Sequence, residues 1–323
     1  QVQRLVESNF ISFFELLKLK QAGQYNKKVS IPKYLHKTKG RQVVPYTKQA
    51  FSYNNGIITL SKTNIHIKTN LKKEEIQAIR ITPCNGSIKI EILYNVQENK
   101  LQKKDNNIAS IDLGVNNLMT VAFTNRKPLI INGKSIKSIN QFFNKEFAKY
   151  KSLATKCNDV YSTERLKRLS VKRRNKINDY LHKAVSFLLN QLVENSITTL
   201  ICGYNKDLKQ DSNMGKLNNQ NFVSIPYLNL VKMLEYKCEL YGIHFIIQEE
   251  SYTSKSSFID KDKLPIYNPN DEKEYKFSGN RIHRGLYKTK NGIKINADVN
   301  GAYNIMRKVV GENLYKMINL IEV

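Results

Sequence analysis

The sequence predicts a protein of two parts: a large α/β domain and, before it, a small domain that is mainly β. Three features support this division. Residues 29–96 read as short strands separated by turns, residues 97–107 form a polar stretch typical of a linker, and the chain beyond them alternates strands with helices. With 323 residues, 41% of them hydrophobic, the chain can pack a core in each part.

The first 22 residues have the spacing of an amphipathic helix. Its apolar face would consist of Leu5, Phe10, Phe13, Phe14 and Leu17. We assign residues 1–28 to this helical segment and residues 29–105 to the β domain, in which Asn55 and Gly56 predict a tight hairpin turn. Because the chain opens on Gln1, and not on Met, directly in a helix, we expect that N-terminal residues are missing.

Residues 106–323 are expected to form the α/β domain. Its strands are expected at 108–114, 117–125, 127–136, 198–205 and 243–250. A long helix before the fourth strand is indicated by the periodic residues Ile177, Leu181, Val185, Leu188 and Leu192. A second helix would begin near Ser224 and Pro226 and stop at Gly242. Three hairpin-linked strands followed by α-β-α-β is the order of an RNase H-like sheet with helices on its faces.

Charge and composition indicate the class of partner. The chain has 53 Lys and Arg against 27 Asp and Glu, a net charge of +26, which predicts a polyanionic partner and favours nucleic acid. The basic stretch of the long helix is the expected phosphate-contacting surface, formed by Arg165, Arg168, Lys172, Arg173, Arg174 and Lys176. A membrane surface is the weaker alternative, because the charge is spread along the chain and no apolar run could span a bilayer.

The four cysteines give no sign of a disulfide scaffold or a zinc ribbon. They are far apart in the sequence and include no CxxC pair: Cys84, Cys157, Cys202 and Cys238. We expect them to be ordinary buried thiols of a cytosolic protein.

Acidic residues interrupt or end several apolar segments. Asp112 lies inside an otherwise apolar strand, where an unpaired carboxylate is costly, although alone it reads as a cap of the turn at Gly114. Asp298 precedes the expected C-terminal helix, where an Asp is commonly an N-cap. Glu249 and Glu250 end the last strand and could be two solvated carboxylates.

The combination is more informative than any single member. In the expected sheet, the strand that ends at Glu250 runs parallel to that of Asp112, and Asp298 begins a helix that can pack across the sheet. Three carboxylates at one edge repel one another unless cations neutralise them. Two divalent ions on oxygen ligands do so while aligning the attacking water and the leaving oxygen of a phosphodiester, so the pattern favours Mg²⁺- or Mn²⁺-dependent hydrolysis.

Five separated stretches occur in the order seen in one known family. They are IASIDLGVNNLMTVAF, RLKRLSVKRRNKINDYLHKAVSFLLNQL, TTLICGYNKDLKQ, YTSKSS and NADVNGAYNIMRK. In these stretches the chain resembles the TnpB (OrfB) proteins of bacterial insertion sequences, which are relatives of type V CRISPR effectors and Fanzor proteins. The resemblance covers most of residues 107–308. The β domain resembles the family's wedge domain, a small β-barrel, and the opening helix the end of its recognition lobe.

The resemblance implies an RNA-guided, metal-dependent DNA endonuclease with a RuvC nuclease domain. Asp112 matches the first catalytic aspartate and Asp298 the third acidic residue. Many members carry the second, a glutamate, at the end of the strand that corresponds here to TTLICGYN, but this chain has Cys202 and Gly203 there.

Some branches take that glutamate from just before the TS motif on the next strand, and Glu250 matches this alternative. We therefore expect Asp112, Glu250 and Asp298 to be the catalytic and metal-binding residues, with Glu249 as the alternate to Glu250.

The family's zinc knuckle, TSxxCxxC, corresponds here to TSKSSFID, so Ser257 and Asp260 stand where cysteines would be expected. FSGNRIHRG has no cysteine pair either, and His283 alone is expected to be a surface or phosphate-facing histidine. We expect no structural zinc, and an inserted loop at 253–292 held by packing, polar contacts or nucleic acid.

The leading hypothesis is a TnpB-like nuclease with guide RNA and target DNA as partners, in the bacterial cytosol with the nucleoid. The displaced glutamate and the missing knuckle motivate an alternative, a nuclease-inactive, RNA-guided regulator of transcription. The historical label of the family suggests a third, a DNA-strand transposase that acts without RNA.

Overall fold

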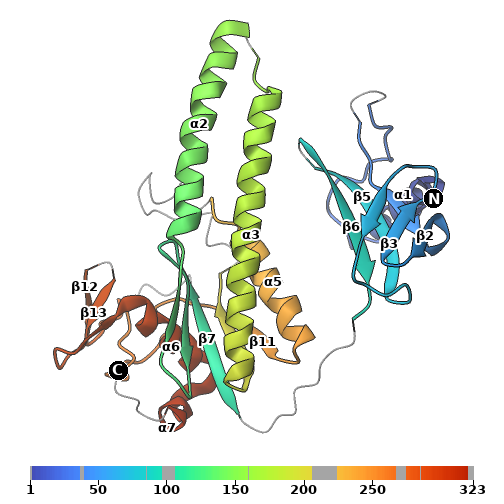
Figure 1. Ribbon diagram of the computed structural model, residues 1–323. Helices are drawn as coiled ribbons and strands as arrows, with labels where there is room; N and C mark the ends of the chain where they lie inside the picture. Colours follow the sequence, from blue (N-terminus) through green and yellow to red (C-terminus); the bar gives the residue numbers. More distant parts are fainter. Residues whose placement is uncertain are drawn as a thin grey trace. The chain divides into compact units, whose positions relative to one another are not determined.

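The computed structural model describes residues 2–36, 40–84, 86–96, 106–158, 160–205, 224–266, 274–283 and 285–318. The chain separates into two compact units, residues 1–96 and 97–323 (Figure 1). No helix within the described ranges is long and apolar enough to cross a membrane.

The first unit holds one helix and two small sheets. The predicted helix is α1 (Val2–Gln21), but its apolar face is at best half-buried and Phe14 is 53% exposed. The strands are β1 (Val44–Thr47), β2 (Phe51–Asn54), β3 (Ile57–Leu60), β4 (His66–Lys68), β5 (Ile76–Cys84) and β6 (Ser87–Tyr94), with a 3₁₀ turn η1 (Lys48–Ala50). They form the antiparallel sheets β1-β5-β6 and β2-β3-β4, which share one apolar core. The predicted turn lies between β2 and β3, with positive φ at Asn55 and Gly56.

The second unit is built on a five-stranded mixed sheet. Its strands are β7 (Asn107–Leu113), β8 (Asn117–Phe123), β9 (Leu129–Asn132), β10 (Ile197–Gly203) and β11 (His244–Gln248), in the order β11-β10-β7-β8-β9. β7, β8 and β9 are antiparallel neighbours, whereas β10 and β11 run parallel to β7. This is the RNase H-like order that the sequence predicts.

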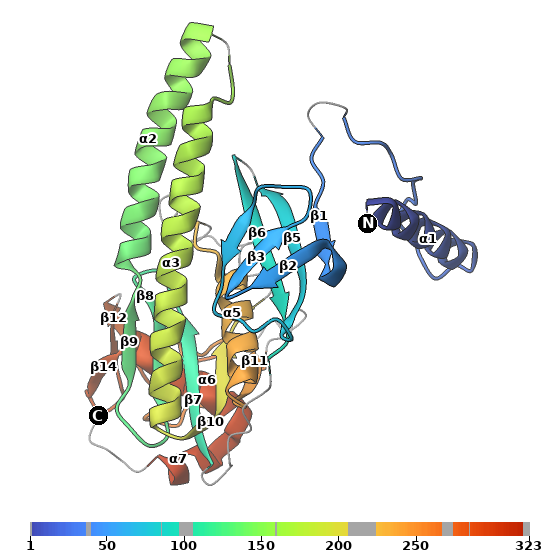
Figure 2. The ribbon, with the colours of Figure 1, turned by 45° about the vertical axis from the view of Figure 1, so that its right-hand side comes forward.

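Helices cover both faces of this sheet (Figure 2). They are α2 (Lys134–Asn158), α3 (Glu164–Glu194), α5 (Tyr227–Leu240), α6 (Ala297–Val310) and α7 (Leu314–Met317), with a 3₁₀ turn η2 (Gly311–Asn313) before α7. α3 and α5 pack on one face and α6 on the other. α5 starts after Pro226 and is followed by Gly242 in a left-handed conformation, as predicted.

α2 and α3 form a long helical hairpin, of which the sequence analysis identified only α3 (Figure 1). The strand expected to run to Ile136 ends at Asn132 instead. The cause is Gly133, whose N–H donates to the carbonyl of Asn116, and where a β-carbon would lie 2.3 Å from the carbonyl oxygen of Val115. The chain therefore turns out of the sheet at Gly133 and α2 begins directly after it.

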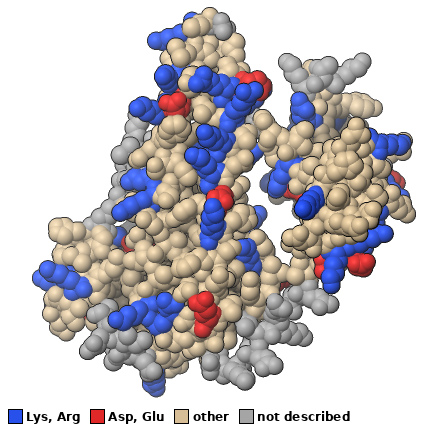
Figure 3. Space-filling view, viewed as in Figure 1, with Lys and Arg blue, Asp and Glu red and all other residues tan. Residues whose placement is uncertain are grey.

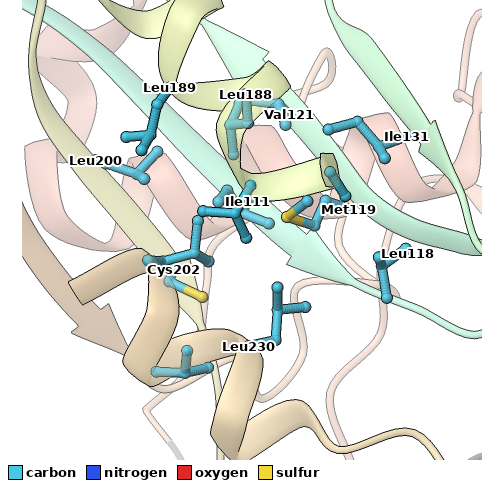
Figure 4. Close-up of a cluster of buried hydrophobic side chains, with 14 of the residues drawn as sticks. Ile111, Leu118, Met119, Val121, Ile131, Leu188, Leu189, Leu200, Cys202 and Leu230 are labelled. Atoms are coloured by element: carbon cyan, nitrogen blue, oxygen red, sulfur yellow. The ribbon is translucent and has the colours of Figure 1, made fainter. Parts of the chain in front are cut away.

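Side chains alternate between the two faces of the sheet, and this alternation directs Asp112. Ile111 of β7 and Val121 of β8 face α3 and α5 in the larger core (Figure 4). Their neighbours Ser110 and Ala122 face α6: Ala122 packs with the apolar residues of that helix, and the Ser110 hydroxyl donates to the carbonyl of Ala302 at 2.7 Å. Asp112, two residues on, lies on the same face, so a buried strand presents a carboxylate to α6 without disturbing the core behind it.

The cysteines are all free, and their surroundings differ. Cys202 and Cys238 lie in the larger core, as expected, and burial raises the pKa of both thiols. The expectation of buried thiols is wrong for Cys157, which is exposed, while Cys84 is half-buried.

The segment predicted as an inserted loop holds regular structure. A three-stranded antiparallel sheet consists of β12 (Asn280–His283), β13 (Leu286–Lys288) and β14 (Lys294–Asn296). β14 leads directly into α6, so this small sheet is connected to the helix that bears Asp298.

Candidate active site

The predicted carboxylates line one cavity in the second unit. The cavity has a volume of about 380 Å³ and lies where the ends of β7 and β11 meet the start of α6. Asp112, Glu250 and Asp298 all border it, whereas Glu249 does not. The fold therefore brings together residues that are 138 and 48 positions apart in the chain.

Asp112 is held close to the backbone of α6. A β-carbon built on Gly301 would lie 2.6 Å from Oδ2 of Asp112, so glycine at this helical position is what lets the carboxylate approach. Burial raises the pKa of Asp112 well above its ordinary value, and the charges of Glu250 and Asp298 raise it further, while Arg281 opposes them. Thr120 of β8 is paired with Asp112 in the sheet, and its buried hydroxyl has no hydrogen-bond partner among the described residues.

Glu250 occupies space next to the end of β10. A β-carbon on Gly203 would lie 3.1 Å from Oε2 of Glu250, so the carboxylate sits beside the strand end where many relatives are expected to carry their glutamate. The carbonyl of Glu250 accepts from the hydroxyl of Thr253 at 2.7 Å, and its N–H donates to Oδ1 of Asn205 at 3.2 Å. Burial, helped by the charge of Glu249, raises the pKa of Glu250 to about 7.

Glu249 has a different partner. Its Oε2 accepts from Nζ of Lys308 at 2.7 Å, and that lysine side chain is only 8% exposed. Lys308 also donates to the carbonyl of Ser251 at 2.6 Å. Burial alone would raise the pKa of Glu249, but the hydrogen bonds from Lys308 and Ser251 outweigh it and lower the value. Between the two adjacent glutamates, the structure turns Glu250 toward the cavity and Glu249 toward α6.

Asp298 lies in the first turn of α6 without acting as its cap. The cap is Asn296, whose Oδ1 accepts from the N–H groups of Asp298 and Val299 at 2.9 and 3.2 Å. The Asp298 carboxylate is thus available to the cavity. Its Oδ2 accepts from Nδ2 of Asn117 at 2.8 Å and its Oδ1 from Nη2 of Arg281 at 2.9 Å.

Two buried asparagines of α6 hold the loop that follows Glu250. Nδ2 of Asn304 donates to the carbonyls of Thr253 and Ser256, at 3.0 and 2.7 Å. Nδ2 of Asn300 donates to the carbonyl of Ser256 at 2.8 Å, and its Oδ1 accepts from the N–H of Phe258. Sequence analysis missed these residues together with Gly301, Lys308 and Arg281. Their signal is the spacing of Asn300, Asn304 and Lys308 along one side of a helix.

The donors suit a hard divalent cation in kind. The charges of Glu250 and Asp298 both raise the pKa of Asp112 at this cavity, so the site is short of positive charge, which oxygen-preferring ions such as Mg²⁺ would supply. As they stand, however, no three His, Cys, Asp or Glu side chains of the described residues form a ready ligand set. Arg281 provides a positive charge to Asp298 in this arrangement.

A polar network stands at the position of the zinc knuckle. The Ser257 hydroxyl donates to Oδ2 of Asp260 at 2.6 Å, and the same carboxylate oxygen accepts from the N–H of Lys290 at 2.9 Å. Asp262 accepts from the N–H groups of Ser257 and Ser278, at 2.8 and 3.1 Å. The two residues expected in place of cysteines therefore bond to each other and connect both ends of the segment. His283 is exposed.

The basic stretch of α3 divides into two kinds of residue. Arg165 lies over the ring of Tyr150 at 3.7 Å and bonds to its hydroxyl, and Arg173 is bound between Asn140 and the carbonyl of Ser224. These two arginines hold the helical hairpin together. The exposed members of the predicted set are Arg165, Arg168, Lys172 and Lys176, whereas Arg173 and Arg174 are half-buried. Figure 3 shows Lys and Arg gathered along α2 and α3.

Comparisons with known proteins agree on one family. The OrfB_IS605 family model, described as a probable transposase, matches residues 91–209, and the Cas12f1-like TNB domain model matches residues 227–305. TnpB-like protein ORF457 of Acidianus two-tailed virus is 25% identical over 348 aligned residues, which cover 93% of this chain and 70% of that protein. Together these similarities support the TnpB family.

Solved structures similar to this chain include two complexes. The chain of a Cas12f1–sgRNA–target DNA complex is 18% identical, with a TM-score of 0.44, over 90% of this chain and 74% of that one. The chain of a CRISPR–Cas12f ternary complex is 17% identical, also with a TM-score of 0.44, over 71% and 45%. Asp112 lies in the segment matched by the first family model, and Glu250 and Asp298 lie in that matched by the second.

Proposed function

We propose that this TnpB-like chain is an RNA-guided, divalent-metal-dependent DNA endonuclease of the RuvC type. The observation that carries the proposal is the single cavity bordered by Asp112, Glu250 and Asp298 on an RNase H-like sheet. A guide RNA and a target DNA are the proposed partners, and the nucleoid-containing cytosol of a bacterium the proposed place of action. A net charge of +26 supports polyanionic partners.

In this proposal each residue has a stated task. Asp112, Glu250 and Asp298 would hold two Mg²⁺ or Mn²⁺ ions, which supply an activated water and stabilise the leaving oxygen. β7 and Gly301 fix Asp112, while Thr253 and Asn205 fix the backbone of Glu250. Arg281, at the rim of the cavity, places a positive charge where a scissile phosphate would enter.

The remaining parts have proposed roles as well. The paired three-stranded sheets of residues 29–105 would correspond to the wedge domain, and α1 to the end of the recognition lobe. The 253–292 segment would be kept in shape by its polar network in place of zinc. These assignments follow the resemblance between the motifs.

The test is guided cleavage. Purified protein with RNA from its own locus should cut a matched duplex in Mg²⁺ and not in EDTA. Loss of a residue that only supports a metal ligand typically costs roughly 10–100-fold in activity. Asp112→Asn and Asp298→Asn remove proposed ligands themselves, so each should slow cutting by more than this, with DNA binding retained. Asp179→Asn, an exposed pair with Lys183 on α3, is the matched control and should cut normally. Cutting that persists in both site variants would rule out this site.

One observation favours testing a second candidate function in the same cleavage experiment. Arg281 already neutralises Asp298, and the carboxylates form no ready ligand set among the described residues. A nuclease-inactive, RNA-guided DNA-binding regulator would show guide-dependent DNA binding without cutting in Mg²⁺ or Mn²⁺. A DNA-strand transposase would instead join or exchange strands in the absence of RNA.

A further inference from the structure

A second cavity lies away from the carboxylates, between the two helices of the hairpin. It has a volume of about 230 Å³ and is lined by Ser138, Ile139, Phe142 and Phe143 of α2 and Leu169, Lys172, Arg173 and Lys176 of α3. Its apolar surface comes from aromatic and aliphatic side chains of both helices, and its charged surface from α3 alone. None of the described residues that line it is acidic.

One wall of this cavity is an exposed aromatic ring. Phe142 is 59% exposed and lines the cavity beside Ile139 and Phe143. Leaving a phenylalanine in water forgoes part of the roughly 1.5–3 kcal/mol that its burial would contribute. Phe143, next to it, is half-buried below the Arg173 guanidinium, whose carbon lies 5.0 Å from the ring centroid.

The opposite wall is rigid and cationic. Arg173 is fixed by hydrogen bonds from Nε to Oδ1 of Asn140, at 2.6 Å, and from Nη2 to the carbonyl of Ser224, at 3.0 Å. Lys172 and Lys176 are exposed, and neither forms an ion pair with any residue in the described ranges. They are four residues apart, about 6 Å along the axis of α3 and on one side of it.

We propose that this cavity binds one unpaired nucleobase of a single-stranded nucleic acid, stacked on Phe142, with the neighbouring phosphates on Lys172 and Lys176. Pockets for drug-sized ligands start near 300 Å³, so a cavity of about 230 Å³ suits a single planar ring system. Stacking on an aromatic ring beside a basic groove is how single strands are bound without sequence preference.

The charges argue against an apolar peptide as the occupant. A helix about 10–12 Å across would not enter a cavity of this size. A single apolar side chain would gain nothing from the two lysines, whereas the phosphates on either side of a base would neutralise both. The inference rests on the proposed function only in taking nucleic acid as the partner; it does not depend on cleavage or on the carboxylates.

The experiment measures binding of the full chain to single strands that contain 2-aminopurine, a base whose fluorescence is quenched by stacking. The measurement is made with RNA and with DNA strands of the same sequence, and the tighter of the two shows which kind of nucleic acid supplies the bound base. Phe142→Ala should weaken binding roughly 5- to 100-fold, the range expected for one stacked base, and abolish the quenching. Phe187→Ala, at a phenylalanine of α3 that is 49% exposed but outside the cavity, should change neither.

Two further arms separate the base from its phosphates. A strand in which the sugar–phosphate chain carries no bases should bind wild type about as weakly as the normal strand binds Phe142→Ala. Raising the salt concentration should weaken Phe142→Ala and wild type with the same slope of log K against log salt. Lys172→Gln with Lys176→Gln should reduce that slope by up to about two, because up to two phosphate contacts are lost.

The outcomes distinguish this inference from the proposed function. Unchanged affinity and quenching in Phe142→Ala, with wild type still binding its locus RNA, would overturn the base pocket and leave the guided nuclease standing. Equal binding of base-free and normal strands would overturn it as well. If wild type bound no single strand and no locus RNA, both proposals would fall.

Discussion

The carboxylate of Glu250 occupies the space that a side chain at Gly203 would need. A β-carbon there would lie 3.1 Å from Oε2 of Glu250 and 2.5 Å from Cδ1 of Ile305. β10 thus ends on a glycine where a glutamate would be expected in many relatives, and Glu250, two residues beyond the end of β11, fills the place. The two positions are complementary: a glutamate after β11 fits beside β10 because residue 203 has no side chain.

Gly203→Ala should therefore impair the site although alanine is small. The added methyl group forces Ile305 or Glu250 to move, which should lower the free energy of unfolding by about 1–3 kcal/mol and slow DNA cleavage roughly ten- to a hundredfold. Thermal unfolding and single-turnover cleavage measure the two effects. Gly285→Ala, where a β-carbon meets nothing within 4 Å, is the control. If Gly203→Ala cleaved DNA at the wild-type rate, the close approach of Glu250 to residue 203 would not matter for activity.

The sequence predicts the sheet and the three carboxylates because both follow local patterns. The strand order is read from alternation and turns, and Asp112 and Asp298 each stand in a recognisable stretch. What it does not predict is set by contacts between distant segments. Arg281 of β12 reaches Asp298 in the first turn of α6, and Gly301 is small because Asp112 approaches it. α2 was missed because Gly133 ends β9 through contacts with the turn at Val115.

The partly buried glutamate makes the metal-free protein sensitive to pH. Glu250 has a pKa of about 7 in the folded protein and 4.5 ordinarily, so between these values the folded state binds more protons than the unfolded state. The contribution of Glu250 to the free energy of unfolding should then fall by up to about 3 kcal/mol as the pH rises from about 4.5 to 7. Glu250→Gln should flatten this part of the curve in EDTA, measured by urea unfolding at several pH values. Superimposable curves for wild type and variant would contradict the assignment.

The Lys308–Glu249 pair is expected to hold the loop before the cavity. Lys308→Met leaves Glu249 without its positively charged partner and should destabilise the protein by about 1–3 kcal/mol, less than for a fully buried pair because Glu249 is 40% exposed. Adding Glu249→Gln should recover part of the loss, and a double-mutant cycle gives the coupling energy. Lys316→Met, an exposed lysine on α7, is the control. Additive single effects would show that the pair is not coupled.

The knuckle segment should depend on Asp260 and not on zinc. Asp260→Asn weakens the bonds to Ser257 and Lys290, and the loss of hydrogen bonds to a charged group should cost about 1.5–3 kcal/mol of unfolding free energy. A zinc chelator should leave the melting temperature of wild type unchanged. Glu235→Gln, at an exposed residue of α5, is the control for Asp260→Asn and should be as stable as wild type. A fall in melting temperature on chelation would point to a structural metal.

The central claim is that Glu250, and not its neighbour, completes the nuclease site. The most direct measurement compares guided DNA cleavage by Glu250→Gln and Glu249→Gln, prepared side by side with the same RNA and with DNA binding measured in parallel. The account predicts that Glu250→Gln binds its target but loses cleavage by at least about a hundredfold, while Glu249→Gln keeps most of it. Full cleavage by Glu250→Gln, or its loss in Glu249→Gln alone, would contradict the account.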